Sequence, residues 1–305
     1  MNMIKRIAVI ANSNKSGVVK ALECVGEWAS AAGAVVDSNL ACDSPPPGTE
    51  GAIFNAEQTE RLRERFAGSD LGVTLGGDGT LLYGAHVFAP IGVPILSVNL
   101  GSLGFHTQSQ PGEIAACLDA VKRGEYRMER RLLLEARIEP PPGNEPPVMA
   151  RTLALNEIVV TKCAWGRMLH VRIFINGKTV SDLFADSFLA ATPTGSTGYN
   201  YAAGGPVIQP DLEAILLNAV CPHRMNFSPL VVDAAAEIRI ESHPLKSDEG
   251  VCLIVDGQGW RNIQPSESVK ISSSPMYLPL IVFEEDYFSK LREKLVWGSL
   301  NRGSF

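Results

Sequence analysis

The sequence predicts an α/β domain followed by a mostly β domain. Its 305 residues exceed the roughly 100 to 200 that one domain usually holds. Apolar runs alternate with amphipathic stretches in the first part of the chain, whereas short strands separated by turn signals follow Tyr126. We therefore expect a Rossmann-like α/β domain over residues 1–123, a β-sandwich-like domain over 124–282, and a C-terminal helix within 283–305 that packs back on the first domain.

The first domain shows a repeated strand–helix–strand pattern. Its predicted strands contain few polar residues, which is typical of a parallel sheet covered by helices on both faces. Pro111 suits the first turn of a helix. The predicted strands are 7–11, 34–36, 71–75 and 94–98, and the predicted helices are 18–32, 56–66, 80–87 and 113–122.

The second part of the chain is expected to be antiparallel. Alternating residues predict strands over 153–160, 169–175 and 188–192, and Asn176-Gly177 favours a type I′ hairpin turn. The proline-rich segment 140–147 is expected to form an exposed hairpin tip. Residues 283–296 are amphipathic and predict the returning helix.

Composition excludes several classes of function. The net charge is −6 and no basic cluster is longer than two residues, so nucleic acid is not an expected partner. No apolar run approaches the roughly 18 residues of a membrane helix, and the chain starts without a signal-peptide pattern, so we expect no membrane partner and a cytoplasmic location. Neither cysteines nor histidines show metal-ligand spacing, which predicts buried, reduced thiols and no protein-held metal. The cysteines are Cys24, Cys42, Cys117, Cys163, Cys221 and Cys252.

The strongest local signal is the run Gly76-Gly77-Asp78-Gly79-Thr80 between a buried strand and a helix. Glycines there let backbone N–H groups approach phosphates, and the helix N-terminus favours an anion. Asp78 would repel phosphates unless a cation or a substrate hydroxyl compensates its charge. This combination suits phosphoryl transfer, in which a carboxylate orients the attacking hydroxyl and accepts its proton. The plainer interpretation is a turn aspartate that caps the helix.

Two further segments carry polar groups suited to a ligand. Asn99 to Phe105 forms a second glycine-rich turn, followed by His106, after the neighbouring strand, so both turns should line one crevice. Thr194, Ser196 and Thr197 place three hydroxyl groups in a loop that Pro193 stiffens.

Polar residues also interrupt two predicted strands. Asn156 and Glu157 lie in one, and Asp186 precedes the other. Such groups are costly in a strand interior unless they are paired, so each is either satisfied by the backbone or reserved for a ligand.

Together these motifs resemble the NAD kinase family, whose members phosphorylate the 2′-hydroxyl of the adenosine ribose of NAD. The resemblance covers nearly the whole chain. It includes the Gly-Gly-Asp-Gly turn, the Asn99–Phe105 turn, Asn156-Glu157, the Thr-Pro-Thr-Gly-Ser-Thr loop with Tyr199, and Asp256-Gly257-Gln258.

The resemblance implies that NAD binds between two domains and that Asp78 is the catalytic proton acceptor. It also implies ATP with Mg²⁺ as phosphoryl donor and a homodimer or homotetramer in which the loop around Tyr199 approaches a neighbouring subunit's site. The residues expected to bind cofactor or substrate are Gly77, Gly79, Thr80, Asn99, Phe105, His106, Asn156, Glu157, Asp186, Thr194, Ser196, Thr197 and Tyr199.

The chain departs from the family pattern in two places. The family often has Arg-x-Asp-Gly before the hydroxyl-rich loop, whereas here Phe184 replaces the arginine and Ser187 the glycine. The usual alanine after Ser-Thr is Gly198. The missing arginine weakens the expected role of Asp186.

Two alternative functions remain open at this point. A lipid or sphingoid-base kinase shares the Gly-Gly-Asp-Gly turn but lacks the Asn99–Phe105 motif. A non-catalytic NAD(P)-binding sensor would most readily have lost Asp78, which is present.

Overall fold

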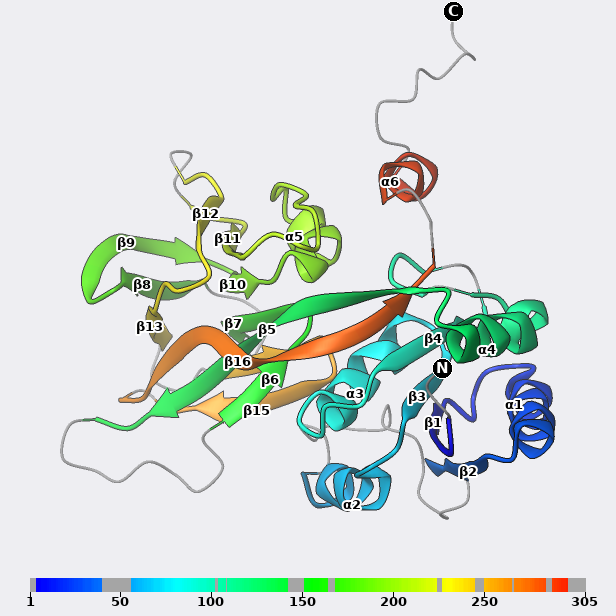
Figure 1. Cartoon of the computed structure of the whole chain (residues 1–305). Coiled ribbons are helices and arrows are strands. Elements are labelled where there is room, and N and C mark those ends of the chain that lie inside the picture. Colours follow the sequence, from blue (N-terminus) through cyan, green and yellow to red (C-terminus); the bar gives the residue numbers. More distant parts are fainter. Residues whose placement is uncertain are drawn as a thin grey trace, which may run out of the picture.

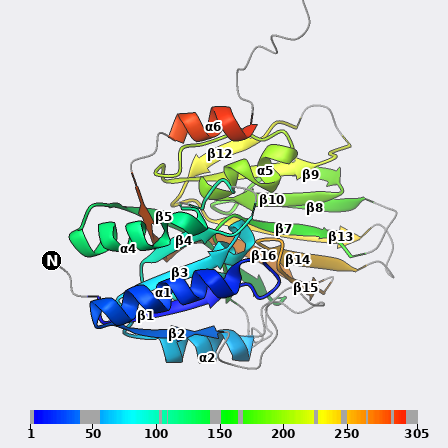
Figure 2. The same ribbon diagram turned by 90° about the vertical axis from the view of Figure 1, so that its right-hand side faces the viewer.

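The computed structural model describes residues 4–39, 56–101, 104–107, 109–141, 151–163, 168–223, 227–244, 250–264, 266–283 and 287–295. It confirms an N-terminal α/β part and a C-terminal part made mostly of strands. In Figure 2 helices α1, α2 and α4 lie towards one side of the molecule and the strands of the second part towards the other. None of the described helices is both long and apolar enough to cross a membrane.

The first part is a parallel sheet in the order β2-β1-β3-β4, covered by helices on both faces. Residues of β1 alternate between the faces: Ala8 and Ile10 pack with α2 and α3, whereas Ile7 and Val9 pack with α1 and α4. This explains the nearly continuous apolar strands. The elements are β1 (Arg6–Ala11), α1 (Val18–Ala32), β2 (Val35–Ser38), α2 (Ala56–Phe66), β3 (Leu71–Gly76), α3 (Asp78–Phe88), β4 (Ile95–Asn99), the 3-10 turn Pro111–Glu113 and α4 (Ile114–Arg123).

The second part is a sandwich of two sheets. An antiparallel sheet in the order β12-β11-β10-β7-β14-β15 packs on the strands β5, β6, β8, β9, β13 and β16, and apolar side chains from both fill the space between them. The elements are β5 (Arg127–Glu139), β6 (Arg151–Ala154), β7 (Glu157–Lys162), β8 (Leu169–Ile175), β9 (Lys178–Ala185), β10 (Ser187–Ala191), the 3-10 turn Thr194–Thr197, α5 (Tyr199–Ala202), β11 (Ala214–Val220), β12 (Leu230–Asp233), β13 (Ile238–Pro244), β14 (Val251–Val255), β15 (Gly259–Ile263), β16 (Ser268–Val282) and α6 (Tyr287–Leu295).

Strand β16 joins the two parts into one continuous sheet. Its end lies parallel to β4, with Leu280 opposite Ile95, while its beginning pairs with β13. Strand β5 runs antiparallel beside it for most of its length, and Figure 1 shows the two strands crossing the middle of the molecule. The predicted boundary at residues 123 and 124 falls between α4 and β5 and stays a prediction.

One predicted turn agrees with the structure, whereas one predicted strand has different bounds. Asn176 and Gly177 have φ of 50° and 76°, which confirms the turn between β8 and β9. The single strand predicted over 153–160 is wrong. Instead β6 ends at Ala154 and β7 begins at Glu157, because the chain crosses there from one sheet to the other. Of the predicted hairpin tip at 140–147, residues 142–147 lie outside the described residues.

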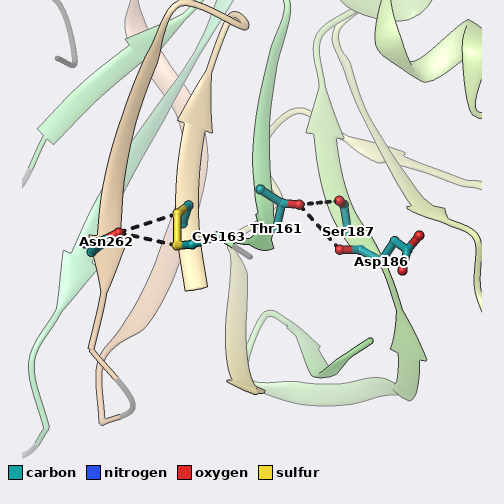
Figure 3. Close-up of a disulfide and its surroundings, with 6 residues drawn as sticks. Thr161, Cys163, Asp186, Ser187 and Asn262 are labelled. Carbon is teal, nitrogen blue, oxygen red and sulfur yellow. Dashed lines mark hydrogen bonds between the residues drawn. A yellow bond between two sulfur atoms is a disulfide. The ribbon is translucent and has the colours of Figure 1, made fainter. Parts of the chain in front are cut away.

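The prediction that all cysteines are buried, reduced thiols is wrong. Cys163 and Cys252 form a disulfide between the end of β7 and the start of β14, and the exposed Cys221 is free. Figure 3 shows the bridge with the side chain of Asn262 beside it. The sequence offered no cue, since 89 residues separate the partners and only strand pairing brings them together. Cys42 lies outside the described residues.

Candidate active site

A pocket of about 480 Å³ opens where the parallel strands end. Its walls come from the turns after β1, β3 and β4, which is the usual ligand position in an open α/β sheet. Among the described lining residues, one comes from the second part of the chain. The lining residues are Ile10, Ala11, Asn12, Lys15, Asn39, Gly77, Asp78, Gly79, Thr80, Tyr83, Asn99, Gly104 and Gln258.

Asp78 lies in this pocket at the first position of α3, two residues earlier than the predicted helix start. Its carboxylate accepts hydrogen bonds from the backbone N–H groups of Phe105, at 2.9 Å, and His106, at 3.2 Å. A Cβ atom at position 104 would lie 2.2 Å from Asp78 Oδ1, so any residue larger than glycine would displace this carboxylate. The second glycine-rich turn therefore holds the carboxylate in one orientation.

The polar residues of the two turns largely shape the turns themselves. A Cβ atom at Gly76 would lie 1.9 Å from Thr80 Oγ1, so the turn packs directly on that buried threonine. Asn99 accepts a hydrogen bond from the backbone N–H of Gly101 and donates one to its carbonyl, at 3.1 and 3.3 Å. Both side chains also line the pocket, so the predicted residues of these turns are brought together.

Phe105 and His106 face a different space. They line a small cavity of about 40 Å³ beside α6, and Phe105 meets the ring of Tyr287 edge-on. Burial lowers the pKa of His106 to about 4, so the imidazole is neutral near pH 7. Helix α6 contacts both parts of the molecule. The Tyr287 ring meets Phe105 of the first part, and its hydroxyl donates to the carbonyl of Ile208 in the second part at 3.2 Å.

A second group of predicted residues surrounds Asn156 and Glu157. A Cβ atom at Gly198 would lie 3.2 Å from Glu157 Oε2 and 3.5 Å from Asn156 Nδ2, so both side chains point at the loop that holds Gly198. Asn156 Oδ1 and Glu157 Oε2 are buried and have no hydrogen-bond partner in the structure. Burial, reinforced by the negative charge of Asp256, raises the pKa of Glu157 to about 8.

Two of the three hydroxyl-bearing residues of the hydroxyl-rich loop are buried and the third is partly exposed. The Ser196 hydroxyl is fully buried, donates to the backbone of Pro193 and accepts from Ile208, which leaves it a structural role. Thr194 is buried and accepts from Arg131 at 3.4 Å. Thr197 is partly exposed, and Tyr199 is 40% exposed.

Asp186 stands apart from these residues. It forms an ion pair with Lys162 at 2.7 Å and lies beyond the end of β10 that is opposite to the hydroxyl-rich loop. Ala191 is five steps along the extended chain from Asp186, a span of roughly 16 Å. Figure 3 shows Asp186 next to Ser187, with Thr161 between this pair and the disulfide. The expected contact between Asp186 and a ligand in its own chain's site is therefore not supported.

Sequence reasoning missed several lining residues, of which Lys15 and Gln258 matter most. Lys15 is the only cationic side chain among the described residues that line the pocket. The sequence signal that could have identified Lys15 is its position in the turn after the first strand, at the edge of the sheet where ligands bind. Gln258 Nε2 donates to the carbonyl of Gly79 at 2.7 Å, which joins a late motif to the glycine turn.

Comparison with known proteins identifies the family. Residues 7–126 match the ATP-NAD kinase N-terminal domain and residues 155–283 match the ATP-NAD kinase C-terminal domain. The chain belongs to the NAD kinase family. It is 34% identical over 296 residues to an NAD kinase of Caldanaerobacter subterraneus, covering 96% of this chain and 99% of that relative. It is 35% identical over 298 residues to an NAD kinase of Citrifermentans bemidjiense, with 97% and 99% covered.

Solved structures of NAD kinases share the fold. A yeast NADH kinase complexed with NADH superposes with a TM-score of 0.84 at 23% identity, covering 100% of this chain and 91% of that one. An NAD kinase from Archaeoglobus fulgidus in complex with ATP gives a TM-score of 0.68 at 25% identity, covering 94% and 98%. The lipid-kinase and sensor alternatives are not favoured.

Proposed function

We propose that Asp78 accepts the proton of the adenosine-ribose 2′-hydroxyl while this kinase transfers the terminal phosphoryl group of ATP to NAD. ATP-dependent phosphorylation of NAD is the activity of its family. The observation that carries the residue assignment is the position of Asp78. Its carboxylate is the only acidic group among the described lining residues, and two backbone amides orient it.

The chain's own groups account for the requirements of phosphoryl transfer. A fixed carboxylate orients the attacking hydroxyl and takes its proton late in the reaction. Gly77 and Gly79 flank it at the start of α3, where backbone N–H groups and the helix dipole favour phosphate oxygens. Lys15 supplies positive charge at the rim of the pocket. Positioning and charge neutralisation are the main contributions that a kinase makes.

The pocket also fits a magnesium ion delivered with ATP. Mg²⁺ is usually bound through one or two carboxylates together with substrate phosphates, and the lining offers one carboxylate, Asp78. Among the described residues no group of three or more histidine, cysteine or acidic side chains could hold a metal. When bound, the ion would neutralise charge on the phosphate chain.

We assign NAD recognition to the second group of residues. Asn156 Oδ1 and Glu157 Oε2 are buried polar oxygens without hydrogen-bond partners. Nearby in the loop that holds Gly198, Thr197 and Tyr199 are at least partly exposed. Asp186 is left out of this set because it lies at the far end of β10.

The assignment of Asp78 is tested by Asp78→Asn in the purified enzyme. We expect kcat for NADP formation to fall by about 10² to 10⁴, the usual contribution of a positioned acid–base group, with NAD binding largely retained. Asp119→Asn is the matched control, since it removes the same charge from an exposed position on α4. A variant of Asp78 that keeps most of its rate would remove the carboxylate from the mechanism.

A substrate panel tests the activity. The purified protein should form NADP from NAD, ATP and Mg²⁺, and should not phosphorylate diacylglycerol or sphingosine. NAD binding without turnover would instead favour the sensor.

Cytoplasmic location and homo-oligomeric assembly also belong to the proposal. Cell fractionation tests the location. Exposed apolar side chains, including Val231 on the edge strand β12 and Tyr199 on α5, support assembly of several copies.

A further inference from the structure

The carboxylate of Asp256 gathers four hydrogen bonds in the interior. It accepts from the backbone N–H groups of Leu155 (2.9 Å), Asn156 (2.7 Å) and Glu157 (3.1 Å), and its fourth contact is His86 Nε2 at 3.1 Å. The side chain of Asp256 is 0% exposed and that of His86 is 5% exposed. The contact with His86 pairs a ring nitrogen with a carboxylate oxygen, and in the tautomer with a proton on Nε2 the histidine donates to Asp256.

These contacts join α3 to the crossing between β6 and β7. His86 lies eight residues after Asp78 on α3, and the three backbone N–H groups belong to the residues where the chain changes sheets. Gly79 and His86 are seven residues apart and therefore lie on one face of the helix. Gln258 contacts Gly79 and Asp256 contacts His86, so one short turn meets α3 at two points.

The backbone of this turn is left-handed at two successive residues, as in the turn at Asn176 and Gly177. Asp256 has φ of 50° and Gly257 has φ of 65°. Aspartate and asparagine adopt the left-handed region more readily than other non-glycine residues, and Asp-Gly is a favoured pair in a tight hairpin turn. From this turn the Asp256 side chain makes its four hydrogen bonds to residues on both sides.

We propose that His86 and Asp256 form an interdomain brace that places Asn156 and Glu157 relative to Asp78. Both are positioning residues for the phosphorylation of NAD. The inference rests on the proposed function for the roles of Asn156, Glu157 and Asp78. His86 is absent from the lining of the 480 Å³ pocket, so the brace acts through the backbone that Asp256 holds.

The test compares three replacements of His86. Gln places an amide nitrogen near the position of Nε2 and keeps a donor, whereas Leu removes the donor and Asn is too short to reach Asp256. We expect His86→Leu and His86→Asn to raise the Kd for NAD, measured by calorimetry, and to lower kcat/KM for NAD by about tenfold or more, because small displacements cost orders of magnitude in rate. KM for ATP should stay within about twofold.

Two controls distinguish a specific loss of NAD affinity from a general loss of stability. Val87→Ala removes buried volume from the neighbouring residue of the same helix, so it should lower Tm without changing the Kd for NAD. His86→Gln should restore most of the affinity. The proposal is overturned if His86→Gln is as impaired as His86→Leu, if Val87→Ala gives the same change in Kd, or if neither His86→Leu nor His86→Asn alters NAD affinity.

The Kd measurement does not depend on turnover. If Asp78→Asn keeps its rate while His86→Leu still weakens NAD binding, the catalytic assignment fails and the brace stands. If Asp78→Asn loses its rate while His86→Leu binds NAD normally, the brace fails and the catalytic assignment stands.

Discussion

Asp78 shows how one side chain depends on a distant glycine. Its carboxylate occupies the space that a Cβ atom at Gly104 would take and binds the two amides that follow. Gly104 in the second glycine-rich turn therefore leaves room for the side chain of Asp78 in the first. The sequence placed both turns in one crevice, but the direct contact between them could not be inferred from their spacing.

Tyr199 tests the NAD side of the proposed site. Its ring is 40% exposed beside Gly198, so we expect Tyr199→Ala to remove contact area and raise KM for NAD about tenfold while kcat changes little. Tyr201→Ala is the control, because Tyr201 is on the same short helix and is 36% exposed. Steady-state kinetics with varied NAD makes the comparison. A defect confined to kcat would contradict the assignment.

Glu157 predicts a dependence of stability on pH. Burial raises its pKa from the ordinary 4.5 to about 8 in the folded protein, so the folded state keeps a proton that the unfolded state releases. The contribution of Glu157 to stability is complete below about pH 4.5 and is lost as the pH rises towards 8.

Glu157→Gln should remove that dependence. We expect the Tm of the variant to exceed that of the parent protein near pH 8 and the difference to shrink towards pH 4.5, measured by thermal unfolding across this range. Glu23→Gln, at an exposed position on α1, should show no such trend. Parallel curves for the Glu157 variant and the parent would contradict the raised pKa.

At the scale of elements, the crossing between β6 and β7 is the main departure from the predicted pattern. The apolar residues on both sides of Asn156 predict one strand, yet they enter the cores of different layers: Leu155 packs with α3, whereas Ile158 packs inside the sandwich. Alternation alone cannot distinguish one strand from two that meet at a break. The break leaves three backbone N–H groups for Asp256.

The disulfide links two adjacent strands of the sandwich and gives a prediction for those elements. Because it closes a segment with a sequence separation of 89 residues, its loss should destabilise the fold by about 2 to 4 kcal/mol. We expect both a reducing agent and Cys163→Ser with Cys252→Ser to lower Tm. Cys221→Ser, at an exposed free thiol, should change neither Tm nor the response to the reductant.

Thiol titration provides the direct measurement. The chain has six cysteines, so the unfolded but unreduced protein should react at no more than four. Reaction at all six would show that the bridge does not form.

On the scale of the whole molecule, one sheet runs through both parts. Because β16 pairs with β4 at one end and β13 at the other, the α/β layer and the sandwich share a backbone hydrogen-bond network. Helix α6 adds a further connection through Phe105 and Ile208. The residues proposed for chemistry and those proposed for NAD recognition consequently lie on opposite sides of a hydrogen-bonded junction.

Assembly is the prediction that belongs to this scale. Strand β12 is an edge strand on which Leu230 and Val231 are 40% and 45% exposed, which suits pairing with another copy. We expect sedimentation to show a dimer or tetramer and Val231→Lys to shift it towards monomer. Val180→Lys is the control, since Val180 is 50% exposed on β9 at the edge of the other sheet. A monomeric parent protein would contradict the prediction.

Local patterns were sufficient to predict the α/β order of the first part, the β-rich second part and the glycine turns, and they led to the proposal of Asp78 as proton acceptor. These features depend on periodicity, turn chemistry and motif order, all of which act over short stretches of chain. Folding alone placed Gln258 against Gly79, His86 against Asp256 and Cys163 against Cys252, and it moved Asp186 away from the other candidates. Each of these outcomes depends on strands and helices that are far apart in sequence, whose neighbours are chosen by sheet pairing and burial.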